Sequence, residues 1–294
     1  MIDQTNRFAL RNRYLFKGRL VMRTAFHIGG GKGTLSSSQS PVVLTPEELP
    51  FIPGSSFKGA LRSIVEKLVP TLPEKAGLFS CGLVELSDEE QLKERLDTEQ
   101  ICSTTRPKYY TNKRRNNPSK DKEINQEAID KLCHTCLLFG SPYTASRINI
   151  NDLYIFQEDE WKGIVELRDG VAIDRDSEKA IDGRKYDFEV VPASAAFDLE
   201  ITLENVTIQD LQLISLGLSE YVSGLGVIGG KRSRGLGVCR LDPLNVYALE
   251  LTGIAEGNRN KLLRNYLLNT NLPEKFPEKS TGQEFLNKHI DTIF

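Results

Sequence analysis

Apolar and polar residues alternate along residues 14–28, and a two-residue period is that of a half-buried β-strand. The first element is therefore expected to be a strand. Residues 57–69 follow a different period, because apolar side chains recur three or four positions apart, at Phe57, Leu61, Ile64, Val65 and Leu68. This spacing predicts an amphipathic helix, and the hydroxyls before it favour a cap by Ser55 or Ser56.

The second half of the chain repeats these two patterns. Strand-like segments occur at 147–156 and 188–204, and helical spacing returns at 207–222 before a closing strand that ends near residue 241. Residues 170–187 have strand-like ends around a polar middle, which predicts a projecting hairpin. The order β, α, insertion, β, β, α, β predicts an α+β fold, a ferredoxin-like (RRM-like) palm with helices on one face of the sheet.

The pattern breaks between the first helix and the later strands. Residues 78–140 combine an acidic helix-like piece at 87–97 with a basic tract at 106–120, and we expect them to form an insertion in a palm that spans 1–241. The basic tract is compatible with RNA contact, but solvated disorder is favoured for a charge run of this kind. The remaining residues, 242–294, have helical patches and are expected to form a C-terminal extension.

The composition is that of a globular protein with enough apolar content for a core. The 294 residues are 39% hydrophobic and carry a net charge of −2, so any basic surface must be local rather than general. No apolar run approaches the roughly 20 residues of a membrane-spanning helix, and the first residues lack the plan of a secretory signal. We therefore expect a cytoplasmic protein without a membrane partner.

Four of the five cysteines have a spacing that suits a metal site. Cys133 and Cys136 form a Cys-x-x-Cys pair, which can bind one ion without strain, and Cys102 and Cys81 lie upstream in the same insertion. An odd cysteine count in a reducing compartment argues against a disulfide framework. A structural zinc held by these four thiolates is therefore expected, with His134 as an alternative ligand to Cys81. A lone redox pair and unliganded buried thiols are the other interpretations.

A glycine-rich segment precedes the closing strand. Gly224, Gly226 and Gly229 match the Gly-x-Gly-x-x-Gly string of dinucleotide sites, but a helix precedes the string and a strand follows it. That order is the reverse of the one a Rossmann site requires, so such a site is excluded. The segment then continues with Gly230 and three cations, Lys231, Arg232 and Arg234. Such a loop suits a phosphodiester chain, and a solvated turn is the alternative.

Two further segments have residues suited to phosphate. The string after His27 is rich in glycine, yet it fails the Walker A spacing, so an ATPase is not expected and His27 is kept as a contact residue at most. At the start of the predicted helix, Lys58 and Arg62 lie at i and i+4 near Ser55 and Ser56. This geometry can hold a phosphate at the positive end of the helix dipole. Exposed cations beside an N-cap are the alternative, and they are favoured when the segment is taken alone.

Four motifs occur together in one order along the chain. They are His27-Ile-Gly-Gly, the stretch 50–62, Cys-x-x-Cys-Leu-Leu-Phe139-Gly140 and Gly-Gly-Lys231-Arg-Ser-Arg-Gly-Leu-Gly237. With them, residues 14–241 resemble the RAMP (repeat-associated mysterious protein) backbone subunits of type III CRISPR effector complexes. The resemblance implies a palm with a β-hairpin thumb at 170–187, and it implies guide RNA, target RNA and other subunits of the effector as partners.

The resemblance also implies which residues contact RNA. They come from the His27 segment, the first helix, the hairpin and the glycine-rich loop: His27, Gly29, Gly30, Lys32, Gln39, Ser55, Ser56, Lys58, Arg62, Ala172, Ile173, Arg175, Gly230, Lys231, Arg232 and Arg234. Backbone and cationic groups of this kind would hold RNA through its phosphates and shape, while base pairing in the guide would supply sequence specificity.

Target-slicing subunits of that family carry an aspartate just before a small residue and Pro-Val, where this chain has Gln39. An amide lacks the charge that a carboxylate offers a divalent ion, and it cannot accept a proton as a base. The resemblance therefore implies a subunit that binds target RNA without cutting it. The alternatives are a metal-dependent endoribonuclease whose acid is Asp174 or Asp176, and a stand-alone guide-processing nuclease that uses His27 as acid and base.

Overall fold

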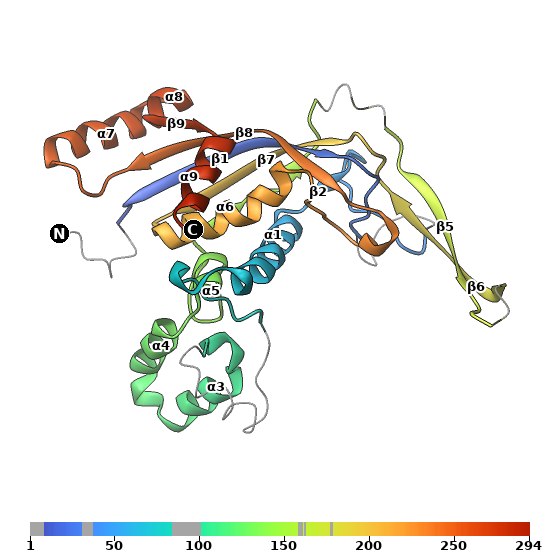
Figure 1. Cartoon of the computed structure of the whole chain (residues 1–294), viewed down its shortest axis with the longest axis horizontal. Helices are drawn as coiled ribbons and strands as arrows, with labels where there is room; N and C mark the ends of the chain where they lie inside the picture. Colours follow the sequence, from blue (N-terminus) through green and yellow to red (C-terminus); the bar gives the residue numbers. More distant parts are fainter. Residues whose placement is uncertain (1–8, 31–37, 84–100, 158–160, 162, 177–178) are drawn as a thin grey trace.

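The computed structural model describes residues 9–30, 38–83, 101–157, 161, 163–176 and 179–294. Within these ranges the chain forms an elongated central sheet with helices packed on it (Figure 1). A hairpin projects from one end of the sheet, and a helical lobe lies below it. The mixed α and β class with an antiparallel sheet, as predicted from the sequence, is confirmed.

In the described part of the chain, antiparallel strands form the central sheet in the order β3-β7-β1-β8-β9. Their bounds are β1 Asn12–Met22, β3 Ile148–Ile150, β7 Ala196–Glu204, β8 Cys239–Glu250 and β9 Glu278–Thr281. β1 lies at the centre, where Phe16 is opposite Ile201 of β7 and Val246 of β8, and all three are buried. The strand ends at Met22, earlier than its apolar alternation predicts.

Three helices cover one face of the sheet. They are α1 Gly54–Leu68, α6 Ile208–Val222 and α9 Gly282–Asp291. The ring centroid of Phe57 on α1 lies 4.9 Å from that of Tyr221 on α6, and Phe285 on α9 meets Phe16 edge to face at 5.2 Å. Aromatic pairs in these geometries add to the free energy of burying their surface. The helices predicted at 57–69 and 207–222 are confirmed.

The C-terminal residues add to the sheet as well as to its second face. Helix α7 Glu256–Leu268 and helix α8 Leu272–Lys275 pack Tyr266 and Phe276 against Leu15 and Leu249. β8 continues past residue 241 to Glu250, and β9 pairs with its edge. No helix in the described ranges has both the length and the apolar content needed to cross a bilayer.

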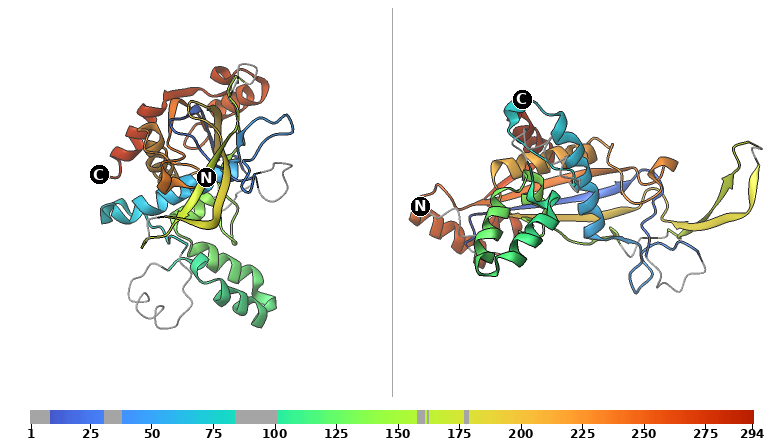
Figure 2. Two further views of the ribbon diagram at one scale, coloured as in Figure 1. Left: turned by 90° about the vertical axis from the view of Figure 1, so that its right-hand side faces the viewer. Right: turned by 90° about the horizontal axis from the view of Figure 1, so that it is seen from below.

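The projecting hairpin consists of β5 Glu166–Ile173 and β6 Ala180–Val190, which confirms the hairpin predicted at 170–187 and extends it toward the sheet (Figure 2). A Cβ atom at Gly170 would lie 2.3 Å from the ring of Tyr186, so glycine allows that ring to lie across the neighbouring strand. A shorter pair of strands, β2 Phe51–Ile52 and β4 Leu153–Tyr154, forms separately.

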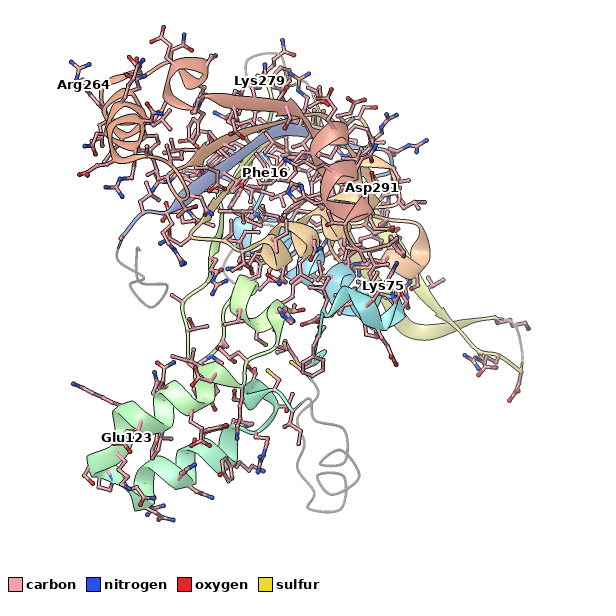
Figure 3. All side chains as sticks on the ribbon, turned by 60° about the vertical axis from the view of Figure 1, so that its left-hand side comes forward. Phe16, Lys75, Glu123, Arg264, Lys279 and Asp291 are labelled. Carbon is pink, nitrogen blue, oxygen red and sulfur yellow. The ribbon has the colours of Figure 1, made fainter. Side chains whose placement is uncertain are left out.

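The insertion forms the helical lobe, with α3 Pro107–Asn116 and α4 Asp121–Asp130, while α5 His134–Phe139 joins it to the palm. Figure 3 shows Glu123 on this lobe, well apart from Phe16 in the palm. The expectation of disorder for the basic tract at 106–120 is wrong, because α4 supplies acidic partners that fix α3 as a helix. The acidic helix-like piece expected at 87–97 lies outside the described residues.

Candidate nucleic-acid interface and metal centre

The glycine-rich loop, residues 224–237, connects α6 to β8 and lies against the segment that contains His27. The N–H of Gly230 donates to the carbonyl of His27 at 2.8 Å, and the N–H of Gly237 donates to that of Ala25 at 2.9 Å. The loop also bonds to itself, since the N–H of Ile228 donates to the carbonyl of Gly237 at 2.9 Å. These bonds give the loop a fixed backbone path beside the first strand.

Two glycines are required for this path. Gly229 has φ +83°, and a Cβ atom there would lie 2.4 Å from the carbonyl oxygen of His27. Gly237 has φ +87°, and its Cβ would lie 2.0 Å from the carbonyl oxygen of Ile228. Only glycine combines a positive φ with so close an approach of two backbones. The glycine string of the sequence is therefore a structural requirement of the loop.

The cations of the loop gather beside two aromatic rings of β6. The Nζ of Lys231 lies 4.3 Å from the ring centroid of Phe188 and 5.3 Å from that of Tyr186. Arg234 donates to the hydroxyl of Tyr186 and lies over its ring, while Arg232 donates to the carbonyl of Gly229. Cation–π contacts hold these side chains in place without neutralising their charge.

His27 is buried and both of its ring nitrogens have partners. Nδ1 lies 2.7 Å from the carbonyl oxygen of Glu189, and Nε2 lies 3.2 Å from the hydroxyl of Ser40. A carbonyl can only accept, so Nδ1 donates to Glu189, and the hydroxyl of Ser40 is the partner of Nε2. His27 therefore joins the Ser40 segment to the base of the hairpin, and this arrangement leaves neither nitrogen facing a substrate.

The segment around Gln39 is bound to β6 by two carboxylates. The N–H of Gln39 donates to Oδ1 of Asp187 at 2.6 Å, and the N–H of Val42 donates to Oε2 of Glu189 at 2.9 Å. We call residues 27–30, 38–42 and 186–189 together with the glycine-rich loop the loop junction. It brings together most of the RNA contacts expected at these two loops, whereas Lys32 lies outside the described residues.

Helix α1 does not begin as the sequence predicts. The expected cap by Ser55 or Ser56 is wrong: Pro53 is the N-cap residue, and Oδ1 of Asp152 accepts from the N–H of Gly54 at 2.8 Å. A cap from a residue about 100 positions away leaves no local signal. Ser55 is exposed and Ser56 is half-buried.

Lys58 and Arg62 face the residues after the Cys-x-x-Cys pair rather than the loop junction. The Nζ of Lys58 donates to the hydroxyl of Ser146 at 2.8 Å and to the carbonyl of Ile148 at 3.3 Å. Burial lowers the pKa of Lys58, and the neighbouring charge of Arg62 lowers it further. Arg62 forms an ion pair with Glu66 at 2.7 Å. Lys58 and Arg62 are thus separate from the cations of the glycine-rich loop.

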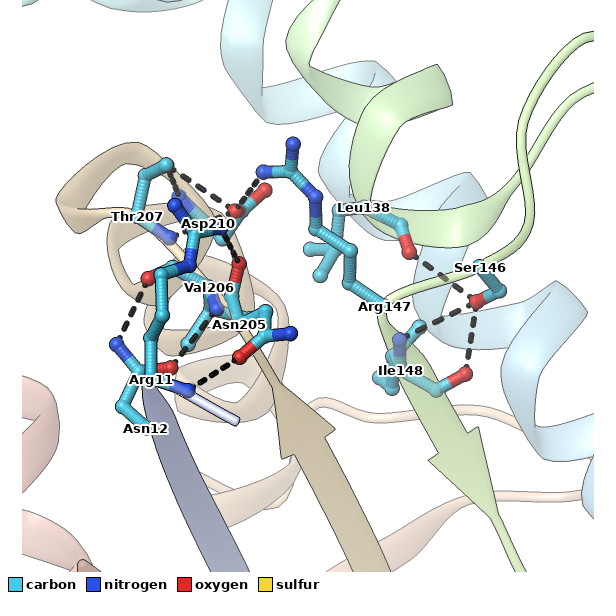
Figure 4. Close-up of polar contacts among 10 residues, drawn as sticks. All are labelled: Arg11, Asn12, Leu138, Ser146, Arg147, Ile148, Asn205, Val206, Thr207 and Asp210. Carbon is cyan, nitrogen blue, oxygen red and sulfur yellow. Dashed lines mark hydrogen bonds and ion pairs between the residues drawn. The ribbon is translucent and has the colours of Figure 1, made fainter. Parts of the chain in front are cut away.

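Figure 4 shows how the same region is tied to α6. The hydroxyl oxygen of Ser146 lies 2.7 Å from the carbonyl oxygen of Ile148 and 3.1 Å from that of Leu138, while Arg147 forms an ion pair with the buried carboxylate of Asp210. Asp210 also accepts from the N–H of Thr207 at 2.9 Å, which completes a capping box at the start of α6. These contacts fix the end of the insertion to the palm.

The remaining expected contacts lie on the hairpin. Arg175 lies in the turn between β5 and β6, where it is exposed. The backbone of β5 includes Ala172 and Ile173, whose side chains lie outside the described part of the chain. Along β6, strand residues rise about 3.3 Å each, so the turn is about 20 Å from Asp187. The hairpin contacts are therefore remote from Gln39.

The four cysteines of the insertion form one cluster. The sulfur atoms of Cys81, Cys102, Cys133 and Cys136 all lie within 4.8 Å of one another, and all but Cys81 are buried. The sulfur atoms of Cys81 and Cys136 are 3.7 Å apart. In a tetrahedral site with Zn–S bonds of about 2.3 Å, sulfur atoms lie about 3.8 Å apart. The residues present therefore fit a zinc ion.

The surroundings of the cluster support thiolate ligands. Hydrogen bonding from Cys133, followed by that from Cys136 and Cys81, lowers the pKa of the Cys102 thiol. Nη2 of Arg62 donates to the sulfur of Cys136 at 3.4 Å and brings a positive charge to it. A thiol must lose its proton to bind a metal, and these two effects favour that loss at Cys102 and Cys136, whereas hydrogen bonding within the cluster raises the pKa of Cys81 and Cys133.

His134 is not needed as a replacement for Cys81. Its ring Nδ1 accepts from the backbone N–H of Phe79 at 3.0 Å, and the backbone N–H of His134 donates to the carbonyl of Phe79 at 3.1 Å. Burial lowers the pKa of His134, which favours the acceptor role of Nδ1. His134 therefore positions the segment from Phe79 to Cys81.

Comparison with known proteins agrees with this architecture. The family model described as the RAMP superfamily matches residues 19–240, which is most of the chain. The chain belongs to the RAMP superfamily. The match begins within β1 and covers α1, the insertion, the hairpin and the glycine-rich loop, so the RAMP region contains every candidate site described above.

Individual RAMP relatives are more distant. A protein of Streptococcus thermophilus named CRISPR system Cms endoribonuclease Csm3 is 24% identical over 78% of this chain and 87% of its own length. A protein of Methanocaldococcus jannaschii with the same name is 24% identical over 85% and 87%. One of Methanothermobacter thermautotrophicus is 34% identical, but over 26% of this chain and 32% of its own length.

Several residues of the loop junction had no individual signal in the sequence. Asp187 and Glu189 alternate with Tyr186 and Phe188 along β6, so that carboxylates and rings point to opposite faces. This alternation predicts a strand with an aromatic face and an acidic face. Nothing in it indicated that one face would meet Gln39 and the other Lys231.

Proposed function

We propose that this RAMP chain is a guide-RNA-binding backbone subunit of a type III CRISPR ribonucleoprotein. Two relatives that align with most of its length are both named CRISPR system Cms endoribonuclease Csm3. The observation that carries the proposal is the convergence, at the loop junction, of Lys231 and Arg234 on the aromatic base of the hairpin, with Arg232 beside them on the same loop. Fixed cations beside exposed backbone suit the phosphates of a polynucleotide.

The strand order supports a ferredoxin-like palm. Without β9, the sheet reads β3-β7-β1-β8, and two helices, α1 and α6, cross between its strands on one face. A β-α-β-β-α-β unit gives this arrangement. In this palm the hairpin of β5 and β6 acts as a thumb, and β9 extends the edge of the sheet. Guide and target RNA then lie along the side where the thumb meets the palm.

We further propose that the subunit positions target RNA without cutting it. Gln39 cannot provide the charge of a carboxylate, and the nearest acids along β6, Asp187 and Glu189, accept hydrogen bonds from the backbone of the Gln39 segment. Asp174 and Asp176 lie in the hairpin turn, about 20 Å along the strand. Asp187 and Glu189 thus anchor the Gln39 segment, and this role explains their presence without catalysis.

A metal-dependent endoribonuclease is the second candidate function, and one observation favours it. Oδ1 of Asp187 lies 2.6 Å from the backbone nitrogen of Gln39, so a carboxylate from another strand lies beside the position of the missing acid. A divalent ion held there would polarise a phosphate and activate a water molecule. In this second candidate function the acid to test is Asp187 rather than Asp174 or Asp176.

Structural zinc is part of the proposal. Cys81, Cys102, Cys133 and Cys136 would hold the ion, and the ion would supply rigidity rather than reaction chemistry, because four thiolates complete its coordination. Arg62 and His134 would position two of the ligand segments. The protein's location in the cytoplasm stays a prediction that follows from this function.

The test uses the assembled complex. After purification with its partner subunits, we expect a protected guide RNA and a labelled complementary target that is bound but not cut in Mg²⁺ at the position of this subunit. The Asp187→Asn variant tests the second candidate, and Asp174→Ala is its matched control. A cut that disappears only in Asp187→Asn would favour the second candidate, and a complex without RNA would overturn the first.

A further inference from the structure

Helix α3 of the lobe has an exposed basic face outside the loop junction. Lys108 and Arg115 are both exposed, seven residues apart, and Thr111 and Asn112 between them are exposed as well. Residues at i, i+3, i+4 and i+7 share one side of a helix. The face therefore presents two cations about two turns apart, with polar side chains between them.

The other cations of α3 are used to hold the helix on α4. Lys113 forms an ion pair with Glu127 at 2.5 Å, and Arg114 forms one with Asp121 at 3.5 Å. Lys108 and Arg115 have no acidic partner within the part of the chain that the structure describes. The acids of α4 thus neutralise the inner cations of α3 and leave those of the outer face with their charge.

An aromatic ring lies beside this face. Tyr109 is 41% exposed, and the guanidinium carbon of Arg106 lies 4.1 Å from its ring centroid. The ring meets that of buried Tyr110 edge to face at 5.0 Å, and Tyr110 in turn contacts Tyr143 at 5.3 Å. Buried neighbours therefore hold Tyr109 at the surface. A fixed, exposed ring between cations is suited to stacking on a nucleobase.

The four-cysteine cluster fixes both ends of the lobe. Cys102 comes directly before the lobe, Cys133 directly after it, and the N–H of Ser103 donates to the carbonyl of Lys131 at 3.2 Å between them. The same cluster contacts α1 through Arg62. The cluster thus ties the lobe that contains α3 to the palm.

We propose that Lys108, Tyr109 and Arg115 form a second RNA-binding surface, which holds a single-stranded segment through two phosphates and one stacked base. Cations alone would suit an acidic protein equally well. The exposed ring of Tyr109 beside them favours a nucleotide, which offers both a phosphate and a flat base. The surface lies on different elements from the loop junction and acts independently of it.

The test uses the full-length chain and a fluorescein-labelled 20-nucleotide oligouridine, with anisotropy measured from 50 to 400 mM KCl. A Lys108→Gln/Arg115→Gln double variant is expected to bind about tenfold or more weakly at 0.1 M salt. Its slope of log K against log salt should be less steep by about 1.4, since each phosphate contact to a single strand contributes about 0.7. Tyr109→Ala should weaken binding about fivefold or more without changing the slope. Lys122→Gln on α4 is the matched control and should bind as the unchanged chain does.

The parallel Lys231→Ala/Arg234→Ala variant separates this inference from the proposed function. If that variant loses RNA while the α3 variants bind normally, the second surface is wrong and the proposed function stands. If the α3 double variant keeps its RNA affinity but no longer joins its partner subunits, the face is a protein contact and the inference is overturned. Thermal melting of each variant checks that the fold is intact.

Discussion

The backbone N–H of Gln39 donates to the carboxylate of Asp187 over 2.6 Å. This bond joins two segments that are 148 residues apart, the loop after His27 and the base of the hairpin. The neighbouring bond from Val42 to Glu189 adds a second link. The hairpin and the loop after His27 are thus one structural unit.

Asp187→Ala is expected to lower the free energy of unfolding by about 1 kcal/mol, because the N–H of Gln39 loses a charged acceptor. Urea denaturation measures the change. Asp176→Ala, in the exposed turn of the same hairpin, is the matched control and should leave the stability unchanged. Equal stability of the two variants would mean that the carboxylate of Asp187 does not anchor the loop.

Gly229→Ala and Gly235→Ala test the path of the glycine-rich loop. Both positions have a positive φ, but a Cβ meets the carbonyl of His27 at Gly229 and nothing within 4 Å at Gly235. We expect Gly235→Ala to cost about 1 kcal/mol from the left-handed backbone alone. Gly229→Ala should cost about 1–3 kcal/mol more, because two backbones must separate. Denaturation midpoints that do not differ would contradict the close approach.

Cys133→Ser is expected to abolish zinc binding and to lower the melting temperature by more than about 10 °C, because metal binding contributes directly to folding. Elemental analysis should find one zinc per unchanged chain. Cys239→Ser is the control: burial raises the pKa of that thiol to about 12, and it lies on β8, outside the cluster. Retention of zinc by Cys133→Ser would remove that residue from the site.

The buried imidazole of His289 makes stability depend on pH. Burial lowers its pKa below the ordinary value of 6.5, and the nearby charge of Lys288 also lowers it. Below pH 6.5 the unfolded chain binds the proton more readily than the folded chain, so stability falls as the pH falls through this range. The drop in melting temperature from pH 7 to pH 5 should be smaller in His289→Leu. An identical drop would mean that His289 does not contribute.

The sequence predicts the elements of the palm well because their burial is periodic. Alternation along β1 and helical spacing in α1 and α6 follow directly from which side chains face one core. The cysteine spacing likewise predicted a cluster that the fold brings together. Such features depend on residue type and separation, which a sequence contains.

Other features depend on partners that are distant in sequence. Asp152 caps α1, and Asp187 binds the Gln39 segment, although nothing near either residue indicates the contact. The basic tract looked disordered because its acidic partner, α4, follows a turn and pairs only in the folded lobe. Lys58 and Arg62 have the helical spacing of an anion site, but burial directs them to Ser146 and Cys136.

The central claim is that the cations of the glycine-rich loop hold RNA phosphates. The direct measurement compares RNA affinity and its salt dependence in the unchanged chain, in Lys231→Ala/Arg232→Ala/Arg234→Ala and in Lys261→Ala/Arg264→Ala, a matched surface variant on α7. We predict that the loop variant loses about 2 from the slope of log K against log salt, while the α7 variant matches the unchanged chain. Equal affinity and slope in all three proteins would contradict the account.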